Sequence, residues 1–352
     1  MTGKFERGIL ILAGGLVIGL LTLAVMYPPS SEITLPDAQL KAPTHSKTED
    51  MDNLAASSIV LIEAAGTSAE SLSDGLDIQT LDPSYNARTL HTAEALSNTF
   101  KRIGYDLDGI KAGGMAVPRL FLASLPLDMS AIRQATERKT IFFKTVLPLI
   151  LQVNDEIRAD RMRLLDLHTR ARDGKHLPAV DRLWLIVLAE RYKVERGDLK
   201  GLLKRVDIMP TSMALAQAAE ESGWGTSRFS REGNAIFGEW TFSGSEGLVP
   251  LQREAGKTHK VRAFRSLLDS VRSYARNLNT HRAYRELRTL REQMRRDGTP
   301  IRGRRLIETL TSYSERGVDY VKDLRAIMSV NKLDGLDAAK LSQPETEERP
   351  VI

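Results

Sequence analysis

The stretch from Pro210 to Gly225 reads PTSMALAQAAEESGWG. Proline suits the first turn of a helix, where its missing N–H costs nothing, and the residues from Met213 to Ala219 favour the helical conformation. Gly223 and Gly225 are typical of the end of a helix. The stretch therefore predicts one short, mostly apolar helix that ends at Gly223.

Glu221 lies at the end of this predicted helix, on the same face as Met213 and Gln217 at i, i+4 and i+8. The negative pole of the helix dipole and burial beside Trp224 would both raise the pKa of its carboxyl group. A glutamic acid that keeps its proton near neutral pH can act as a general acid. We therefore expect Glu221 to be a proton donor, whereas Glu220 fits a solvated surface.

Residues 8–27 form a second clear feature, because they read GILILAGGLVIGLLTLAVMY without a single charge. As a helix, about 20 apolar residues span roughly 30 Å, the thickness of the hydrocarbon core of a bilayer. Lys4 and Arg7 precede the run, so residues 1–7 are expected in the cytoplasm and the rest of the chain is expected to be exported. No clean signal-peptide cleavage site follows, and we expect an uncleaved transmembrane anchor.

The composition beyond the anchor indicates an extended linker. Residues 28–114 are rich in Ser, Thr, Asp and Gly, and we expect them to be largely disordered, except for a short amphipathic helix at Thr92–Ile103. The last stretch, residues 334–352, is expected to be a disordered tail.

Between linker and tail the pattern is helical. Residues 115–205 alternate apolar and charged residues at helical spacing and are expected to form the helical N-terminal part of the folded region. Residues 206–333 are expected to form the catalytic domain, and the glycine-rich segment 238–256 is the one place suited to a β-hairpin. The predicted class is mainly α (α+β) with a small hairpin.

The composition also excludes several kinds of site. The chain has no cysteine, which excludes disulfides, thiolate zinc sites and cysteine nucleophiles. No His/Asp/Glu cluster has metal-ligand spacing and no glycine-rich phosphate loop follows a strand, so we expect no metal and no cofactor. The net charge of +5 is mild and by itself suits any polyanion, including cell wall, nucleic acid or an anionic membrane face, or a solubility surplus without a partner. We expect no nucleic-acid partner.

The string AQAAEESGWG at 216–225 resembles the active-site helix of glycoside hydrolase family 73, which comprises peptidoglycan β-N-acetylglucosaminidases. In that family the catalytic glutamate directly precedes the serine, a position that Glu221 occupies here. Other segments between residues 138 and 333 resemble the family in the same order along the chain. They are NAIFG at 234–238, AFRS and DSV at 263–271, YSERGVDY at 313–320, and, as in the Bax-type subgroup, RVDIMPTS at 205–212 and NLNTH at 277–281.

The resemblance implies a lysozyme-like fold and a set of site residues. Glu221 and Tyr320 are expected to be catalytic. Amides, hydroxyls and aromatic rings suit the acetamides and faces of sugars, and the expected substrate-binding residues are Ser222, Trp224, Asn234, Phe237 and Tyr313. Packing at the end of the helix is an equally good interpretation of Trp224, and packing between helices remains an alternative for both tyrosines.

A second catalytic carboxylate is harder to assign from the sequence. Glycosidases commonly use a pair of carboxyl groups, and the hairpin region offers Glu239, Glu246 and Glu254 without a clear match to the family pattern. One of them could serve, water could attack without a strong base, or the N-acetyl group of the substrate could be the nucleophile. In the last case Tyr320 or Tyr313 would position that group.

These features together predict an endo-β-N-acetylglucosaminidase that cleaves GlcNAc–MurNAc strands of peptidoglycan by general acid catalysis. A muramidase or lytic transglycosylase also needs one glutamate and remains an alternative, as does a non-catalytic wall-binding scaffold. The anchor predicts a single-pass membrane protein with an exported catalytic domain. The resemblance to the Bax-type subgroup of Gram-negative bacteria implies that the membrane is the inner membrane and that the domain lies in the periplasm.

Overall fold

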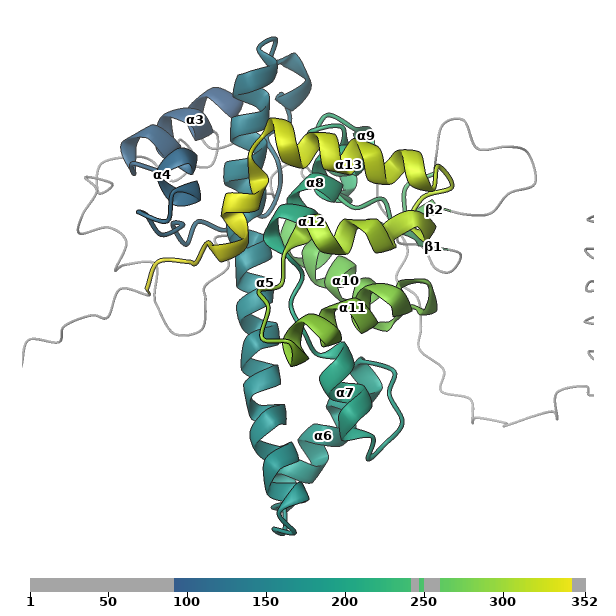
Figure 1. Ribbon diagram of the computed structural model, residues 1–352. Helices are drawn as coiled ribbons and strands as arrows, with labels where there is room; N and C mark the ends of the chain where they lie inside the picture. Colours follow the sequence, from purple (N-terminus) through teal and green to yellow (C-terminus); the bar gives the residue numbers. More distant parts are fainter. Residues whose placement is uncertain (1–91, 242–246, 250–259, 344–352) are drawn as a thin grey trace, which may run out of the picture. The chain divides into compact units, whose positions relative to one another are not determined.

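Helices dominate the computed structural model, which describes residues 92–241, 247–249 and 260–343 (Figure 1). The chain divides into two units, residues 1–53 and 54–352, and all described residues belong to the second. The α-helices are α3 (Ala93–Arg102), α4 (Leu107–Lys111), α5 (Ala135–Arg172), α6 (Ala179–Arg191), α7 (Leu199–Arg205), α8 (Thr211–Ser222), α9 (Arg228–Gly233), α10 (Leu267–Thr280), α11 (Arg285–Arg296), α12 (Gly303–Leu306) and α13 (Val318–Val330). The 3-10 helices are η1 (Met129–Ala131), η2 (Arg282–Tyr284), η3 (Ile307–Ser312) and η4 (Leu333–Ala338).

The strands of the described part are a two-residue antiparallel pair, β1 (Trp240–Thr241) and β2 (Lys260–Val261), with Trp240 opposite Val261. The prediction of a mainly α chain with a small β element is confirmed for these residues. The second strand lies beyond the segment 238–256 in which the sequence analysis expected the hairpin.

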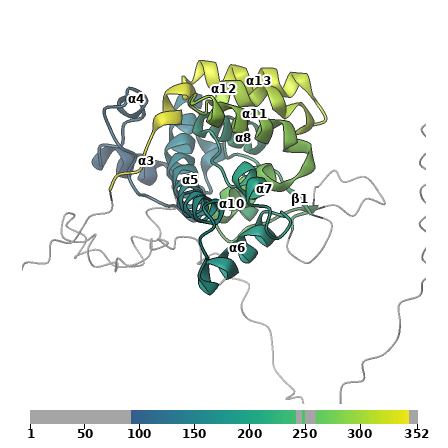
Figure 2. The same cartoon turned by 60° about the horizontal axis from the view of Figure 1, so that its bottom comes forward.

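Helix α8 is the buried centre of the fold, and its predicted existence and end are confirmed. Every residue from 211 to 219 is buried, as expected for a helix that is apolar on all sides. Gly223 ends the helix in the left-handed conformation with φ 57°, which glycine adopts without steric cost. Helices α5 and α13 lie on either side of α8 in both views of the chain (Figures 1 and 2).

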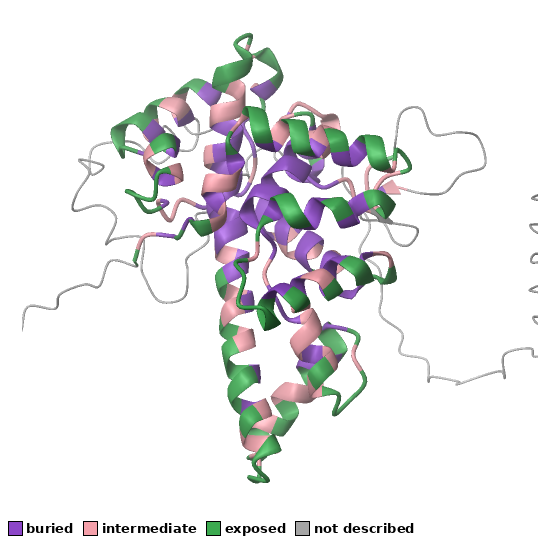
Figure 3. Cartoon of the chain, viewed as in Figure 1, coloured by how far each residue is buried: buried purple, intermediate pink, exposed green. Residues whose placement is uncertain are grey.

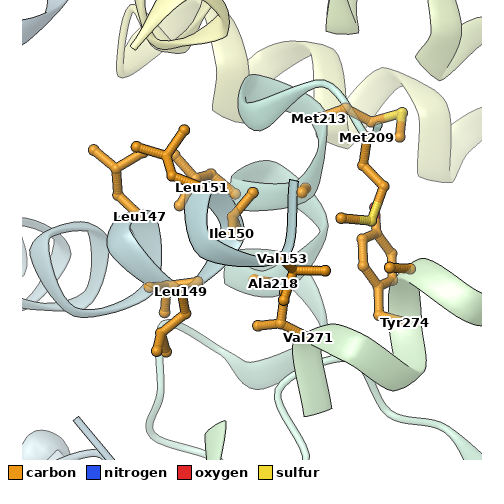
Figure 4. Close-up of a cluster of buried hydrophobic side chains, with 14 of the residues drawn as sticks. Leu147, Leu149, Ile150, Leu151, Val153, Met209, Met213, Ala218, Val271 and Tyr274 are labelled. Atoms are coloured by element: carbon orange, nitrogen blue, oxygen red, sulfur yellow. The ribbon is translucent and has the colours of Figure 1, made fainter. Parts of the chain in front are cut away.

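Helix α5 supplies the longest wall of the core. Its residues 141–154 are mostly buried, whereas its distal end and α6 are mostly exposed or half-buried (Figure 3). Figure 4 shows Leu149, Ile150 and Val153 of α5 in one cluster with Ala218 of α8 and side chains of α10. Because alanine leaves little side-chain volume on α8, the neighbouring helices can approach its backbone closely.

Residues at both ends of the described part are folded, which corrects two expectations. Within the expected linker 28–114, α3 and α4 bury Leu96, Phe100 and Ile110. Within the expected tail 334–352, Leu341 forms a parallel bridge with Val117. The helix at Thr92–Ile103 was predicted, whereas the weak periodicity of the rest of the segment 28–114 gave no sign of α4.

Asp337 in η4 connects this C-terminal segment to the centre of the fold. Its carboxylate accepts hydrogen bonds from the backbone N–H of Ser212 (2.9 Å) and that of Gly303 (2.9 Å). It thereby satisfies N–H groups in the first turns of both α8 and α12, which have no partners inside their own helices. At Gly303 a Cβ atom would lie 2.8 Å from the backbone nitrogen of Met213, so only glycine allows this approach.

None of the helices in the described ranges is both long and apolar enough to span a bilayer. The predicted anchor at residues 8–27, the linker up to residue 91, and the candidate carboxylates Glu246 and Glu254 lie outside the described residues.

Candidate active site

The carboxyl group of Glu221 lies in the last turn of α8, half-buried and next to the backbone of Gly238. A Cβ atom on Gly238 would lie 3.2 Å from Oε2 of Glu221, so glycine lets the chain pass close to the carboxyl group. Burial raises the pKa of Glu221, and the negative charge of Glu220 raises it further. A hydrogen bond from Tyr320 and the positive charge of Arg316 act in the opposite direction, and the net shift is upward.

The segment that carries Gly238 is held in place by Asn234 and Phe237. Asn234 ends α9 in the left-handed conformation (φ 51°), and its Nδ2 donates to the carbonyl oxygens of Phe264 (3.2 Å) and Arg265 (3.3 Å). Phe237 is buried and stacks on Tyr274 with ring centroids 3.8 Å apart and planes 8° apart. Both contacts fix the position of the Gly238 backbone opposite Glu221.

Four tyrosines from different elements gather round Glu221. Tyr313 stacks on Tyr320 (centroids 5.4 Å apart, planes at 5°) and lies 5.8 Å from the ring of Tyr284. The Tyr313 hydroxyl donates to the carbonyl oxygen of Phe237 (3.3 Å). Burial raises the pKa of all four hydroxyls, including Tyr274 and, to about 12, Tyr284. They are therefore neutral hydroxyl groups at physiological pH.

Gln217 joins two of these tyrosines one helical turn before Glu221. The Tyr274 hydroxyl donates to Gln217 Oε1 (2.6 Å), and Gln217 Nε2 donates to the Tyr320 hydroxyl (3.2 Å). Tyr320 in turn makes the hydrogen bond to Glu221. The result is a buried chain of hydrogen bonds that runs from α10 through α8 to α13 and ends on the carboxyl group.

A second carboxyl group, that of Glu239, lies directly after Gly238. Its Oε2 accepts from the Ser273 hydroxyl (2.7 Å) and lies 3.9 Å from Arg262, while its Oε1 is buried with no hydrogen-bond partner among the described residues. Burial raises its pKa, against the effects of Ser273 and Arg262. Both Glu239 and Glu221 raise the pKa of Tyr284, so each of the two carboxyl groups lies near that hydroxyl.

Comparison with known proteins identifies the family to which the chain belongs. The glucosaminidase family, described as mannosyl-glycoprotein endo-beta-N-acetylglucosaminidase, matches residues 198–333. Protein bax of Escherichia coli (strain K12) is 37% identical over 216 residues, which are 60% of this chain and 75% of that protein. The chain belongs to the glucosaminidase family. Membership indicates a glycoside hydrolase, and no solved structure matches the chain.

The range matched by the family contains Glu221 and every contact of its carboxyl group described above. Tyr313, Tyr320 and Asn234, three of the residues expected at the site, lie on or beside the cluster round Glu221. Glu239 is the one of the three candidate second carboxylates that the described residues include.

Two expected substrate-binding residues have other positions in the structure. Ser222 is fully buried: its hydroxyl donates to the carbonyl oxygen of Ala218 (2.6 Å) and accepts from the N–H of Gly225 (2.9 Å). It therefore closes the end of α8 and is not open to a ligand. Phe237 is likewise buried beneath Tyr274 and supports that ring. Ser222 follows Glu221 and Phe237 precedes Gly238 in the chain. Both residues therefore support the backbone of the site and do not face a ligand.

Trp224 packs against α5. Its backbone is left-handed (φ 61°), which turns the ring towards Phe143 (centroids 5.4 Å apart) and Phe142 (6.2 Å). The Lys139 ammonium lies 4.6 Å from the ring centroid, within the range of a cation–π contact. These contacts match the interpretation of Trp224 as a packing residue at the helix end.

Two contributors to the site, Tyr274 and Tyr284, were not expected from the sequence. Gln217 was placed on the face of Glu221, but its partners were not foreseen. The available signal was a polar residue on the otherwise apolar α8, four positions before the proposed acid. A buried amide requires hydrogen-bond partners, although the sequence does not say which residues supply them.

The segment that leads into α8 is held by a buried ion cluster. Arg295 contacts both oxygens of Asp207 (3.1 and 2.8 Å), and the buried Arg291 lies 3.9 Å away. Asn154 makes paired hydrogen bonds with the backbone of Met209 (2.8 and 3.0 Å). Burial of Asp207 would raise its pKa, but Arg291 and Arg295 outweigh that effect and the net pKa is lowered. These contacts of Asp207 and Asn154, which we call the clamp, fix the position at which α8 begins.

We predict that Asp207→Ala lowers the free energy of unfolding by about 3–5 kcal/mol, because it leaves the Arg291 charge buried without its carboxylate. Since the folded pKa of Asp207 is lowered, its contribution is complete above about pH 4 and is lost as the pH falls through the folded value. Urea unfolding at pH 7 and at lower pH measures both effects.

The matched control is Glu190→Ala, which removes one member of an exposed pair with Arg196. It should change the free energy of unfolding by less than about 0.5 kcal/mol. Equal, small losses for the two variants would contradict the role of the clamp.

Proposed function

We propose that this chain is an endo-β-N-acetylglucosaminidase that hydrolyses GlcNAc–MurNAc strands of peptidoglycan, with Glu221 as the general acid. The observation that carries the proposal is a half-buried glutamate with a raised pKa, at the end of a buried helix and beside a glycine backbone. Glycosidic cleavage needs a proton on the leaving oxygen as positive charge develops on the sugar ring. The resemblance of residues 216–225 to the family's active-site helix supports the assignment to Glu221.

Glu239 is the second carboxyl group that we propose for the reaction. Its Oε1 is buried and has no hydrogen-bond partner among the described residues, so it could accept a hydrogen bond from water or from the substrate. Tyr320 and Tyr313 are neutral and could instead position the N-acetyl group of the substrate, if that group attacks the sugar. We place the fold with lysozyme-like hydrolases, and a glutamate at a helix end near a small antiparallel strand pair supports this placement.

Substitution of the acid tests the function. Glu221→Gln in the full-length protein should reduce release of glycan fragments from purified cell wall by about 10²–10⁴-fold, because the amide cannot donate the required proton. Binding to sedimented wall should remain. Mass spectrometry of the products identifies the cleaved bond: reducing-end GlcNAc supports the proposal, whereas 1,6-anhydro-MurNAc indicates a lytic transglycosylase.

The control for this experiment is Glu232→Gln, an exposed glutamate on α9 that pairs with Arg228. It should retain full activity. Undiminished cleavage by Glu221→Gln would remove Glu221 from the mechanism, and wall binding without cleavage by the wild type would indicate a scaffold.

The charges beside Glu221 predict opposite shifts of the pH profile. The acid works in its protonated form, so the rate falls as the pH rises through its pKa. Glu220→Gln removes a charge that raises this pKa and leaves Arg316, its ion-pair partner at 2.7 Å, paired with Asp323 alone. The basic limb of the rate profile should therefore move to lower pH, by up to about one unit. Arg316→Ala should move it to higher pH, and shifts in the same direction would contradict the assignment.

We also propose that residues 8–27 anchor the protein in the inner membrane and that the catalytic domain lies in the periplasm. The uncharged apolar run and the cations before it support this topology. Protease added to spheroplasts should degrade the domain while a cytoplasmic marker survives, and carbonate washing should leave the protein in the membrane. A protected domain or a carbonate-soluble protein would contradict the topology.

A further inference from the structure

Three buried side chains from three helices connect the core to Glu221. Tyr274 on α10, Gln217 on α8 and Tyr320 on α13 are each at most 1% exposed. Their contacts form one series: the Tyr274 hydroxyl to Gln217 Oε1, Gln217 Nε2 to the Tyr320 hydroxyl, and Tyr320 to Glu221. Since the groups are shielded from solvent, each relies on the next for its hydrogen bond.

The distances indicate which group donates each hydrogen bond in the series. The 2.6 Å separation between Tyr274 and Gln217 falls in the range of an O–H···O bond, and the 3.2 Å separation between Gln217 and Tyr320 suits N–H···O. Tyr274 therefore donates to the amide oxygen, which turns the amide nitrogen towards Tyr320. Because the Tyr320 oxygen accepts from Gln217, its own hydrogen is directed to the Glu221 carboxyl group.

We propose that Gln217 and Tyr274 are positioning residues that act on Glu221 through Tyr320, by fixing the direction of the Tyr320 hydroxyl. This inference rests on the proposed role of Glu221 as the acid. In the protonated acid, the oxygen that accepts from Tyr320 is the carbonyl oxygen. The proton is therefore on the other oxygen, which is left to donate to the leaving group of the substrate. The stacking of Tyr274 on Phe237 keeps the start of the series in place.

The groups that face Glu221 come from every element packed around it. The charged ones are Glu220 on α8 and Arg316 before α13. The others are neutral tyrosine hydroxyls, at Tyr274, Tyr284, Tyr313 and Tyr320. Removal of one hydroxyl leaves both charges in place. A change in the titration of Glu221 then reports on the hydrogen bonds alone.

A double-mutant cycle tests whether Tyr274 acts through Tyr320. Tyr274→Phe should lower kcat for wall cleavage by about tenfold with little change in KM, because one hydrogen bond in the series is lost. It should also move the basic limb of the profile to higher pH, because Tyr320 lowers the pKa of Glu221. The variant with both Tyr274→Phe and Tyr320→Phe should be no slower than Tyr320→Phe alone.

The inference would be overturned if the losses of kcat multiplied in the double variant, or if Tyr274→Phe left the pH profile unshifted. The control is Tyr105→Phe, which removes a buried hydroxyl with no hydrogen-bond partner among the described residues. It should change neither kcat nor the pH profile. A general loss of packing would affect both variants.

A titration separates this inference from the proposed function. The side-chain carboxyl signal of Glu221, in protein labelled with ¹³C-glutamate, is assigned by its absence in Glu221→Gln. Its midpoint should rise in Tyr274→Phe and in Gln217→Leu. An unchanged midpoint in Tyr274→Phe would overturn the inference even if the wild type cleaves wall. A raised midpoint would support it even if the wall is not the substrate.

Discussion

A helix that is buried on all sides must find partners inside the protein for every polar side chain it carries, because water cannot reach them. Helix α8 is such a helix, and its polar residues determine much of what surrounds it. Ser222 bonds the backbone at the helix end, and Gln217 bonds two tyrosines that belong to α10 and α13. The packing of those two helices and the environment of Glu221 therefore have a common cause.

Glu221 is at the edge of this buried region, and its environment is a balance of opposing effects. Burial and Glu220 favour the neutral acid, while Tyr320 and Arg316 favour the carboxylate. Burial alone would stabilise a permanently protonated group, and strong pairing would stabilise a permanent anion. A group that exchanges protons during a reaction needs a pKa between these limits. The opposing effects of burial and Glu220 on one side, and of Tyr320 and Arg316 on the other, allow the pKa of Glu221 to lie between them.

Local signals in the sequence were sufficient for α8, whereas partners far along the chain were not predictable. Pro210, Gly223 and the small residues between them determine the helix from within, and the face shared by Gln217 and Glu221 follows from helical spacing. Tyr274 belongs to the site only because α10 packs beside α8, 57 positions earlier in the chain. The direction of the Trp224 side chain was unpredictable for the same reason, because it depends on a left-handed backbone and on the aromatic rings of α5.

The position of Asp337 has a consequence for how the protein is made. The ribosome must synthesise 125 further residues after Ser212 before the carboxylate that caps α8 exists. Helix α8 therefore cannot reach its final state while the chain is still growing towards η4. Such distant pairings form late and slowly during folding. A nascent or truncated polypeptide that ends before Asp337 would lack this contact to the first turn of α8, so the surroundings of Glu221 would be complete only once this segment has been translated.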